Sequence, residues 1–141
     1  MIAYVDASVL LRLALGQLDS LSEWSKIDRG VASALVTTES LRTLDRLRIR
    51  VKLADSEVAL RRAKILELIA SLEVVDVDSV VLDRAAQPMP TELGTLDAVH
   101  LATALVWKEM TAESLTMATH DAALAMAATA YGLPVIGAKR K

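Results

Sequence analysis

Residues 94–105, GTLDAVHLATAL, are the stretch around which the rest of the chain can be understood, because they place Asp97 in the first turn of an otherwise apolar helix. The apolar side chains of this stretch point in nearly every direction around the helix axis, which predicts a buried helix. Asp97, His100 and Thr103 interrupt it at intervals of three residues. A polar stripe on a buried helix predicts an opening onto a cleft, a metal ion or a ligand.

The start of this helix predicts the charge of Asp97. Thr95 is expected as the N-cap residue, and a carboxylate soon after it meets free N–H groups and the positive end of the helix dipole. We therefore expect Asp97 to be ionised at neutral pH. The alternative interpretation is that Asp97 only caps the helix. For His100, one turn further on, a structural hydrogen bond in the core is favoured over a contact with substrate.

Length and composition predict one domain over residues 1–141, and the absence of Cys predicts a location in the cytoplasm. The chain has 141 residues, 53% of them hydrophobic, with no Phe and no Cys. This length suits a single domain with a substantial core. The longest uncharged stretch, residues 122–138, is too short and too rich in Gly and Pro for a membrane span, and residues 1–6 do not resemble a signal peptide.

The basic residues are unevenly distributed. A net charge of −2 excludes a generic nucleic-acid-binding polycation. Eight of the 16 basic residues nevertheless lie within residues 42–64, here called the basic arm, against three acids, and a short basic tail occupies residues 139–141. The basic residues of the arm are Arg42, Arg46, Arg48, Arg50, Lys52, Arg61, Arg62 and Lys64. The arm is predicted to hold a polyanion; the alternative is an ordinary solvated helix surface.

Short apolar runs alternate with helical patterns along the whole chain. Strands are predicted at residues 2–5, 31–36, 73–77, 115–118 and 134–136, and helices at residues 9–15, 20–28, 40–52, 55–72, 79–87, 95–106 and 121–132. Ser20 is the expected N-cap of the second helix and Asp55 that of the fourth. This alternation predicts an α/β domain with a mainly parallel five-stranded sheet and helices on both faces, which makes a three-layer sandwich.

Four acids are predicted to meet at one edge of that sheet. Asp6, Glu39 and Asp121 each follow a predicted strand, and Asp97 begins a helix. Converging acids without Lys or Arg partners repel one another unless a cation holds them. Oxygen-only ligands favour Mg²⁺ or Mn²⁺ over Zn²⁺, and such a site suits phosphodiester hydrolysis.

Two hydroxyl groups lie close to these acids in the sequence. Ser8 is two residues after Asp6, and Thr119 is two residues before Asp121. They would orient a carboxylate or a metal-bound water from behind the ligands. The alternative is that both hydroxyls only stabilise turns and helix caps.

Four motifs in order give the chain a clear resemblance. They are YVDASVLLRL at residues 4–13, TTESLR at residues 37–42, GTLDAVHLATAL at residues 94–105 and TMATHDAALAMAATAYGLPVIG at residues 116–137. With these motifs the sequence resembles a PIN domain, specifically the VapC-like ribonuclease toxins of bacterial toxin–antitoxin pairs, over essentially its whole length. The resemblance implies a sheet of strand order 3-2-1-4-5, an Mg²⁺- or Mn²⁺-dependent endoribonuclease, a homodimer, and inhibition by a cognate antitoxin.

The resemblance also implies roles for particular residues. The family's acidic positions match Asp6, Glu39, Asp97 and Asp121, which are the predicted catalytic residues. Asp6, Asp97 and Asp121 are the predicted metal ligands. Antitoxins of this family usually insert a segment with Arg or Lys toward the acids. On the basic arm, the candidates to bind RNA or antitoxin are Arg42, Arg46, Arg48 and Arg50.

Two other functions are compatible with part of this pattern. A phosphatase of the haloacid-dehalogenase type also has an Asp after its first strand, but it needs a second Asp where this chain has Ser8. The other alternative is a PIN-like module that binds RNA or a partner without cutting it. The four intact acids argue against this second alternative.

Overall fold

A computed structural model describes residues 1–138, and the basic tail predicted at residues 139–141 lies outside the described residues. Five parallel strands form one sheet in the order β3-β2-β1-β4-β5, which confirms the predicted sheet and its strand order. The strands are β1 (Ile2–Val5), β2 (Arg29–Ser33), β3 (Glu73–Val75), β4 (Thr116–Ala118) and β5 (Val135–Ile136).

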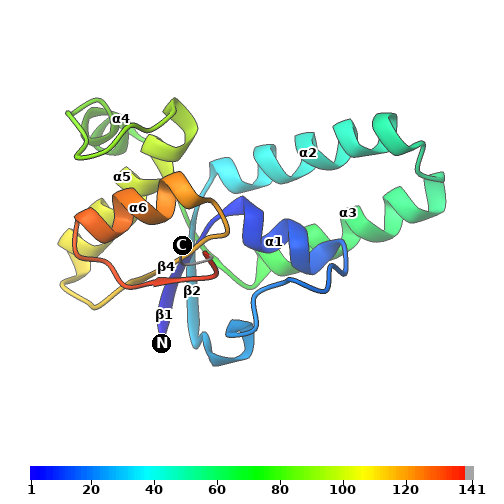
Figure 1. The fold of residues 1–141 in the computed structure, drawn as a ribbon, viewed down its shortest axis with the longest axis horizontal. Helices are drawn as coiled ribbons and strands as arrows, with labels where there is room; N and C mark the ends of the chain where they lie inside the picture. Colours follow the sequence, from blue (N-terminus) through cyan, green and yellow to red (C-terminus); the bar gives the residue numbers. More distant parts are fainter. Residues whose placement is uncertain (139–141) are drawn as a thin grey trace.

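Helices cover both faces of the sheet (Figure 1). They are α1 (Ala7–Ala14), α2 (Leu35–Val51), α3 (Asp55–Ala70), α4 (Ser79–Ala85), α5 (Thr95–Thr111) and α6 (Ala122–Ala130). Side chains alternate along β1, so Ala3 and Val5 pack with α1, α2 and α3, whereas Tyr4 packs with α5 and α6. Helix α4 packs on α5 through Val81 and Val99. Because Asp6 is two residues after Tyr4 and its backbone is still extended, its side chain is expected on the same face of the sheet as Tyr4, the face covered by α5.

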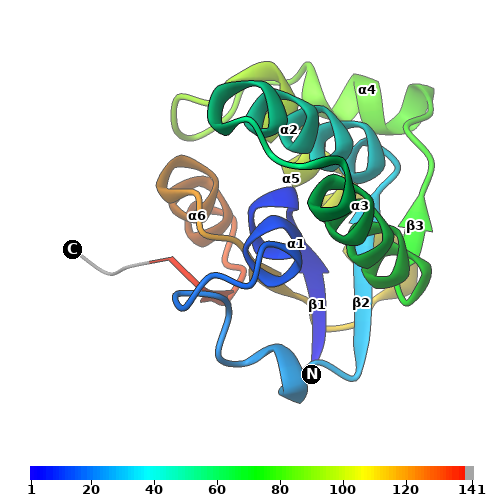
Figure 2. The same cartoon turned by 90° about the vertical axis from the view of Figure 1, so that its right-hand side faces the viewer.

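Helices α2 and α3 form a hairpin that projects beyond the sheet (Figure 1) and points toward the viewer in Figure 2. The turn of the hairpin begins at Lys52, whose backbone is left-handed at φ 51°. The basic arm occupies this hairpin. Its cations lie along these two helices, and the first of them, Arg42, is three residues after Glu39 on α2.

The predicted strand at residues 31–36 is displaced along the chain, because β2 begins two residues earlier, at Arg29, and also ends earlier. Strand β2 ends at Ser33, and α2 begins at Leu35 instead of near residue 40. The hydroxyl of Ser33 accepts a hydrogen bond from the N–H of Leu35 at 3.1 Å, which favours the turn into the helix. Glu39 therefore lies within α2 and not at the junction between strand and helix. A short buried apolar run does not distinguish the end of a strand from the first turn of a buried helix.

Three helix starts also differ from prediction. Residues 20–28 contain only a 3₁₀ turn, Trp24–Lys26, and the N-cap residues of α3 and α5 are Ala54 and Gly94 rather than Asp55 and Thr95. Asp97 is thus the third residue of α5. Among the described residues, no helix has the length and apolar character needed to cross a membrane.

Candidate active site

Asp6 follows β1 directly, as predicted, and is held by two hydroxyl groups. Its backbone is still extended, at φ −82° and ψ 156°, and the residue is only 5% exposed. Ser8 and Thr119 both donate hydrogen bonds to its Oδ2 atom, at 2.8 and 2.7 Å. Both contacts go to one oxygen, which fixes the carboxylate group and leaves Oδ1 without a hydrogen bond in the described part of the chain.

Asp121 is brought next to this arrangement by the turn after β4. It is the N-cap residue of α6, and its Oδ1 atom accepts a hydrogen bond from the N–H of Leu124 at 2.9 Å. Its own N–H donates to the hydroxyl of Thr119 at 3.0 Å. Thr119 therefore connects Asp6 to Asp121, two acids that are far apart in the sequence.

Asp97 is half-buried in the first turn of α5, and its pKa departs from expectation. Burial, followed by the negative charges of Asp121 and Asp6, raises the pKa of Asp97 from 3.8 to about 6. The argument from the helix dipole predicts a lowered pKa for Asp97, because it considers only the helix in which Asp97 lies. The carboxylate still ionises below neutral pH, so the predicted charge at pH 7 holds although the predicted cause does not.

Glu39 is paired with the buried His100. His100 is 0% exposed, its Nε2 atom contacts Oε1 of Glu39, and its Nδ1 atom lies 2.5 Å from the hydroxyl of Tyr4. The expected structural hydrogen bond of His100 is present. Burial by itself lowers the pKa of His100, but the hydrogen bond to Glu39 and the charges of nearby acids outweigh it and raise the pKa.

The four acids share one electrostatic site. Asp121, Asp6 and Glu39 all contribute to the raised pKa of Asp97. In the described part of the chain, the ion-pair contacts of these acids are those of His100 with Glu39 and, at 3.9 Å, with Asp6. No Lys or Arg within residues 1–138 forms an ion pair with any of them. The site therefore concentrates negative charge, which a cation from solution would relieve.

The donor chemistry of the site fits a hard divalent cation, since carboxylate oxygens are the ligands that Mg²⁺ and Mn²⁺ prefer. Within residues 1–138, however, no three carboxylate or histidine side chains stand close enough together to hold a metal ion. Mutual repulsion is a sufficient reason for carboxylates to stay apart without a cation between them. The residues present fit the ion in kind, and their side chains would have to approach one another to bind it.

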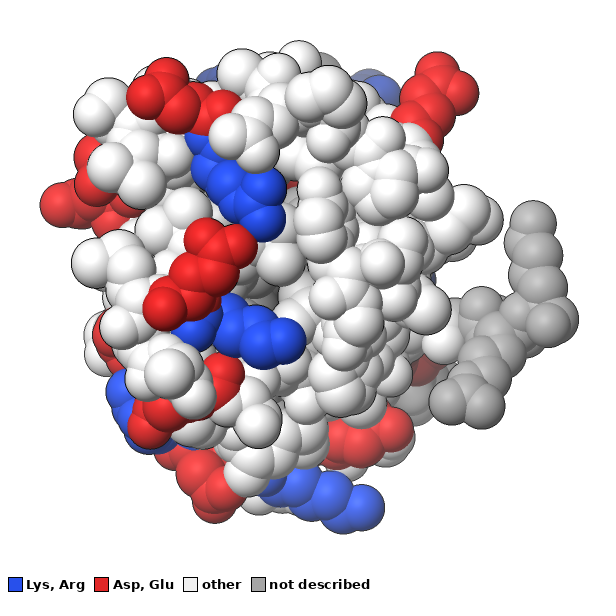
Figure 3. Space-filling model, turned by 90° about the vertical axis from the view of Figure 1, so that its left-hand side faces the viewer, with Lys and Arg blue, Asp and Glu red and all other residues white. Residues whose placement is uncertain are grey.

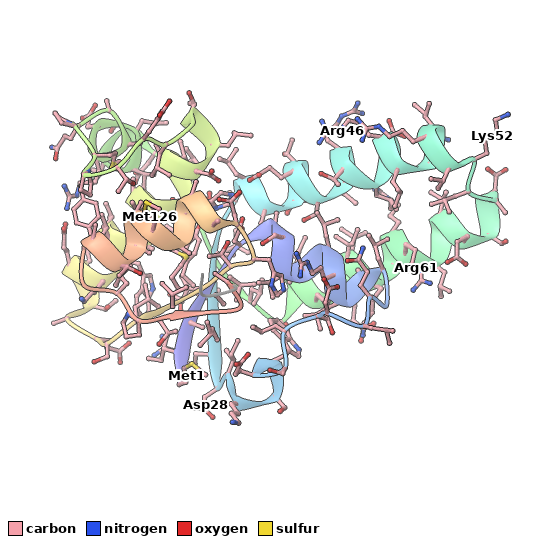
Figure 4. The ribbon with its side chains drawn as sticks, viewed as in Figure 1. Met1, Asp28, Arg46, Lys52, Arg61 and Met126 are labelled. Atoms are coloured by element: carbon pink, nitrogen blue, oxygen red, sulfur yellow. The ribbon has the colours of Figure 1, made fainter. Side chains whose placement is uncertain are left out.

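The four arginines proposed to bind RNA or antitoxin lie on α2, further along the hairpin. Arg42 and Arg48 both form ion pairs with Asp45, at 3.1 and 2.9 Å. Arg46 and Arg50 are exposed and form no ion pair within residues 1–138, and Figure 4 shows Arg46 pointing away from α3. Arg42 lies about one helical turn after Glu39 on α2, and the other three arginines lie further along the helix. Two of the four, Arg46 and Arg50, have no acidic partner within residues 1–138.

Sequence reasoning missed the link from Glu39 through His100 to Tyr4. The position of His100, three residues after Asp97, was a usable signal for a contact near the site. Tyr4 gave none, because a tyrosine in a buried strand is ordinary. The pairs are separated by 61 and 96 residues in the sequence, so only the folded chain reveals them.

Comparison with known proteins agrees with the fold. A family model described as "PIN domain" matches residues 3–130. The chain is 34% identical over 136 residues to Ribonuclease VapC46 of Mycobacterium tuberculosis. This alignment covers 94% of this chain and 95% of that protein.

Two solved structures share the fold at low sequence identity. A toxin–antitoxin complex from Klebsiella pneumoniae matches with a TM-score of 0.65 at 14% identity, over 96% of both chains. VapBC2 from Rickettsia felis, bound to a DNA fragment from its promoter, matches with a TM-score of 0.65 at 13% identity, over 96% of this chain and 97% of that one. With the sequence match over nearly its whole length, the chain belongs to the PIN domain family.

Proposed function

We propose that this protein is a divalent-metal-dependent endoribonuclease toxin that a cognate antitoxin neutralises. The observation that carries the proposal is the pKa of about 6 at Asp97, raised by burial and by the charges of Asp121 and Asp6. The shift supports a group of acids that share negative charge without a Lys or Arg partner, which is the chemistry of a cation site. The ribonuclease activity of the relative VapC46 supports RNA as the substrate.

Asp6, Asp97 and Asp121 are the residues that would hold Mg²⁺ or Mn²⁺. When bound, such an ion stabilises negative charge on the phosphate and makes water more acidic. Ser8 and Thr119 hold Asp6 through one oxygen, which keeps its other oxygen available. Both hydroxyls therefore act as orienting groups behind a ligand, as well as stabilising the local turns.

Glu39 is proposed to accept the proton of the attacking water. Its carboxylate is half-buried, and Oε1 is held by His100, whereas Oε2 has no hydrogen bond within residues 1–138. A carboxylate with one fixed and one available oxygen is suited to proton transfer. The expected products are one fragment with a phosphate end and one with a hydroxyl end, produced by hydrolysis.

The hairpin of α2 and α3 is the proposed contact surface for RNA or antitoxin. Arg46 and Arg50 lie on α2, the helix that begins next to the acids and carries Glu39. The face opposite the hairpin has scattered charges and a broad uncharged area (Figure 3), so it offers less to a polyanion. RNA bound along α2 would lead its backbone toward the acids.

The same family supports three further proposals. Structural relatives include toxin–antitoxin complexes, which supports a protein antitoxin as the regulator of this chain. A homodimer is expected from the resemblance to VapC-like toxins. The cytoplasm is the expected location, because the proposed RNA substrate is found there.

The test is cleavage of a panel of structured RNAs by the purified protein, free of antitoxin, in Mg²⁺, Mn²⁺ or EDTA. Asp6→Asn is the site variant. Asp83→Asn is the matched control, because Asp83 is exposed on α4 and forms no hydrogen bond or ion pair within residues 1–138. We expect discrete cuts that need the metal, are lost in Asp6→Asn and persist in Asp83→Asn.

Other outcomes point to specific alternatives. Cuts that persist in EDTA would contradict metal dependence, and equal cutting by Asp6→Asn would identify a contaminating nuclease. RNA binding that is equal with and without metal, with no cleavage, would favour the noncatalytic binding module. Membership of the PIN domain family removes the haloacid-dehalogenase alternative.

A further inference from the structure

A chain of three polar side chains runs from the centre of the sheet to the acidic site. Tyr4, on the central strand β1, contacts Nδ1 of His100 on α5, and Nε2 of His100 contacts Oε1 of Glu39 on α2. Tyr4 and His100 are both 0% exposed. Three elements that are distant in the sequence are thus joined by two hydrogen bonds inside the core.

This arrangement is costly for a hydrophobic core. The neighbours of His100 on α5, Val99 and Leu101, are buried aliphatic residues, and the Tyr4 and His100 rings pack edge to face with centroids 5.8 Å apart. Buried polar groups are tolerated when all are satisfied, but aliphatic side chains would stabilise such a core at least as well. A fully buried imidazole that reaches a catalytic acid is therefore better explained by the site than by packing.

The direction of the second hydrogen bond follows from the partners. An ionised carboxylate only accepts, so Nε2–H of His100 must donate to Glu39. Asp6 is further from the same nitrogen, at 3.9 Å, which is beyond hydrogen-bond distance. The hydroxyl of Tyr4 on the opposite side of the ring fixes its rotation. His100 consequently directs its Nε2–H group at one acid, Glu39.

We propose that His100 is a positioning residue, which, supported by Tyr4, fixes Oε1 of Glu39 through its Nε2–H group and leaves Oε2 available for proton transfer. This inference rests on the proposed nuclease function, in which Glu39 accepts the proton of water. Without His100, Glu39 would be a half-buried side chain with several accessible rotamers. The rate of the chemical step would then fall while RNA binding, which depends on other residues, would remain.

Two amide variants separate positioning from packing. The side-chain nitrogen of His100→Gln can occupy the place of Nε2 and donate to Glu39, whereas the amide of His100→Asn reaches only the place of Nδ1. We expect His100→Asn to lower kcat by about 10–100-fold with KM changed less than about twofold, and His100→Gln to stay within about threefold of the wild type. Thermal unfolding of both variants is measured to check that each is folded at the assay temperature.

Proton NMR gives a readout that does not depend on activity. The chain contains only two histidines, so the His120→Gln variant assigns the imidazole N–H signals. We expect a downfield Nε2–H signal from His100, protected from exchange, that persists in His120→Gln and moves in both Glu39→Gln and Tyr4→Phe. Equal kcat for folded His100→Asn and His100→Gln would overturn the proposal, as would a His100 signal unaffected by Glu39→Gln. If the wild type cuts no RNA, the nuclease proposal fails, whereas the NMR test still decides whether His100 holds Glu39.

Discussion

Replacing Asp97 by Asn should make the metal-free protein more stable at neutral pH, although Asp97 belongs to the proposed active site. Its pKa of about 6 in the folded state compares with 3.8 as the ordinary value. Below pH 3.8 the group is protonated in both states, and its favourable contribution to folding is complete. That contribution is lost as the pH rises through about 6, because ionisation is harder in the folded state.

The size of the effect follows from the shift. A raised pKa of this size corresponds to about 3 kcal/mol above pH 7 if it is converted in full. Asp97 is half-buried, and solvent screening reduces the expected gain of Asp97→Asn to ~1–2 kcal/mol. For a chain of this length the gain is roughly 3–8 °C in Tm. The difference should be small near pH 4, grow between pH 4 and 6, and level off above pH 7.

The assay is thermal unfolding followed by circular dichroism, in EDTA, at pH values from 4 to 8. The wild type, Asp97→Asn and the exposed control Asp83→Asn are compared at each pH. The control should follow the wild type above pH 5. A folded Asp97→Asn that is less stable than the wild type at pH 8, or a difference that does not change with pH, would refute the argument that repulsion and burial dominate at Asp97.

Three further changes test the metal site, the basic arm and a tight turn. Mn²⁺ at about 100 times its Kd should stabilise the wild type by roughly 2.7 kcal/mol, seen as a rise in Tm, and should barely affect Asp97→Asn. Replacing Arg46 and Arg50 together by Gln should weaken RNA binding, measured by fluorescence anisotropy. The slope of log K against the logarithm of the salt concentration should become shallower by about 1.4, which is about 0.7 for each lost phosphate contact. Gly137→Ala should lower the free energy of unfolding, measured by urea denaturation, by more than Gly132→Ala does. Both glycines have positive φ, but only at Gly137 would a Cβ lie 2.7 Å from a backbone oxygen.

Each of these has a control in the same region. For the arginines it is the double change of Arg42 and Arg48, which already pair with Asp45 and should affect RNA binding less. Equal effects of the two double changes would show that only the total charge of the hairpin matters. If Gly132→Ala and Gly137→Ala lower the free energy of unfolding equally, the close approach to the backbone oxygen does not explain the loss at Gly137. An equal rise in Tm for the wild type and Asp97→Asn would place the ion elsewhere.

The sequence predicts the sheet well because its information is local. Each strand is a short apolar run between turn residues, and Asp6 and Asp121 stand where such runs end. The prediction failed where a short apolar run is compatible with both a buried strand and the first turn of a buried helix. The apolar residues after Ser33 belong to the start of α2 and not to β2. Glu39 was predicted to follow a strand directly, whereas it lies within helix α2.

The electrostatics of the site could not be predicted from neighbours in the sequence. The local environment of Asp97, a helix start, favours the charged form, whereas the folded structure brings Asp121 and Asp6 near it and reverses the direction of the pKa shift. The contact of His100 with Glu39 has the same origin. Both effects come from residues at least 20 positions away in the sequence, which pattern analysis does not bring together.

The acids of the site have no Lys or Arg ion-pair partner within residues 1–138, and this explains why the site would favour an external cation. An arginine beside Asp97 would lower the pKa of that carboxyl and stabilise the fold, but it would compete with a metal ion for the same oxygens. Neutral hydroxyls from Ser8 and Thr119 hold Asp6 instead. Arg46 and Arg50, which form no ion pair within residues 1–138, lie on the hairpin. The repulsion that remains lowers the stability of the metal-free protein, a cost expected of sites built for function. The same repulsion would favour binding of a divalent ion, so the instability and the proposed metal-dependent activity would have one cause.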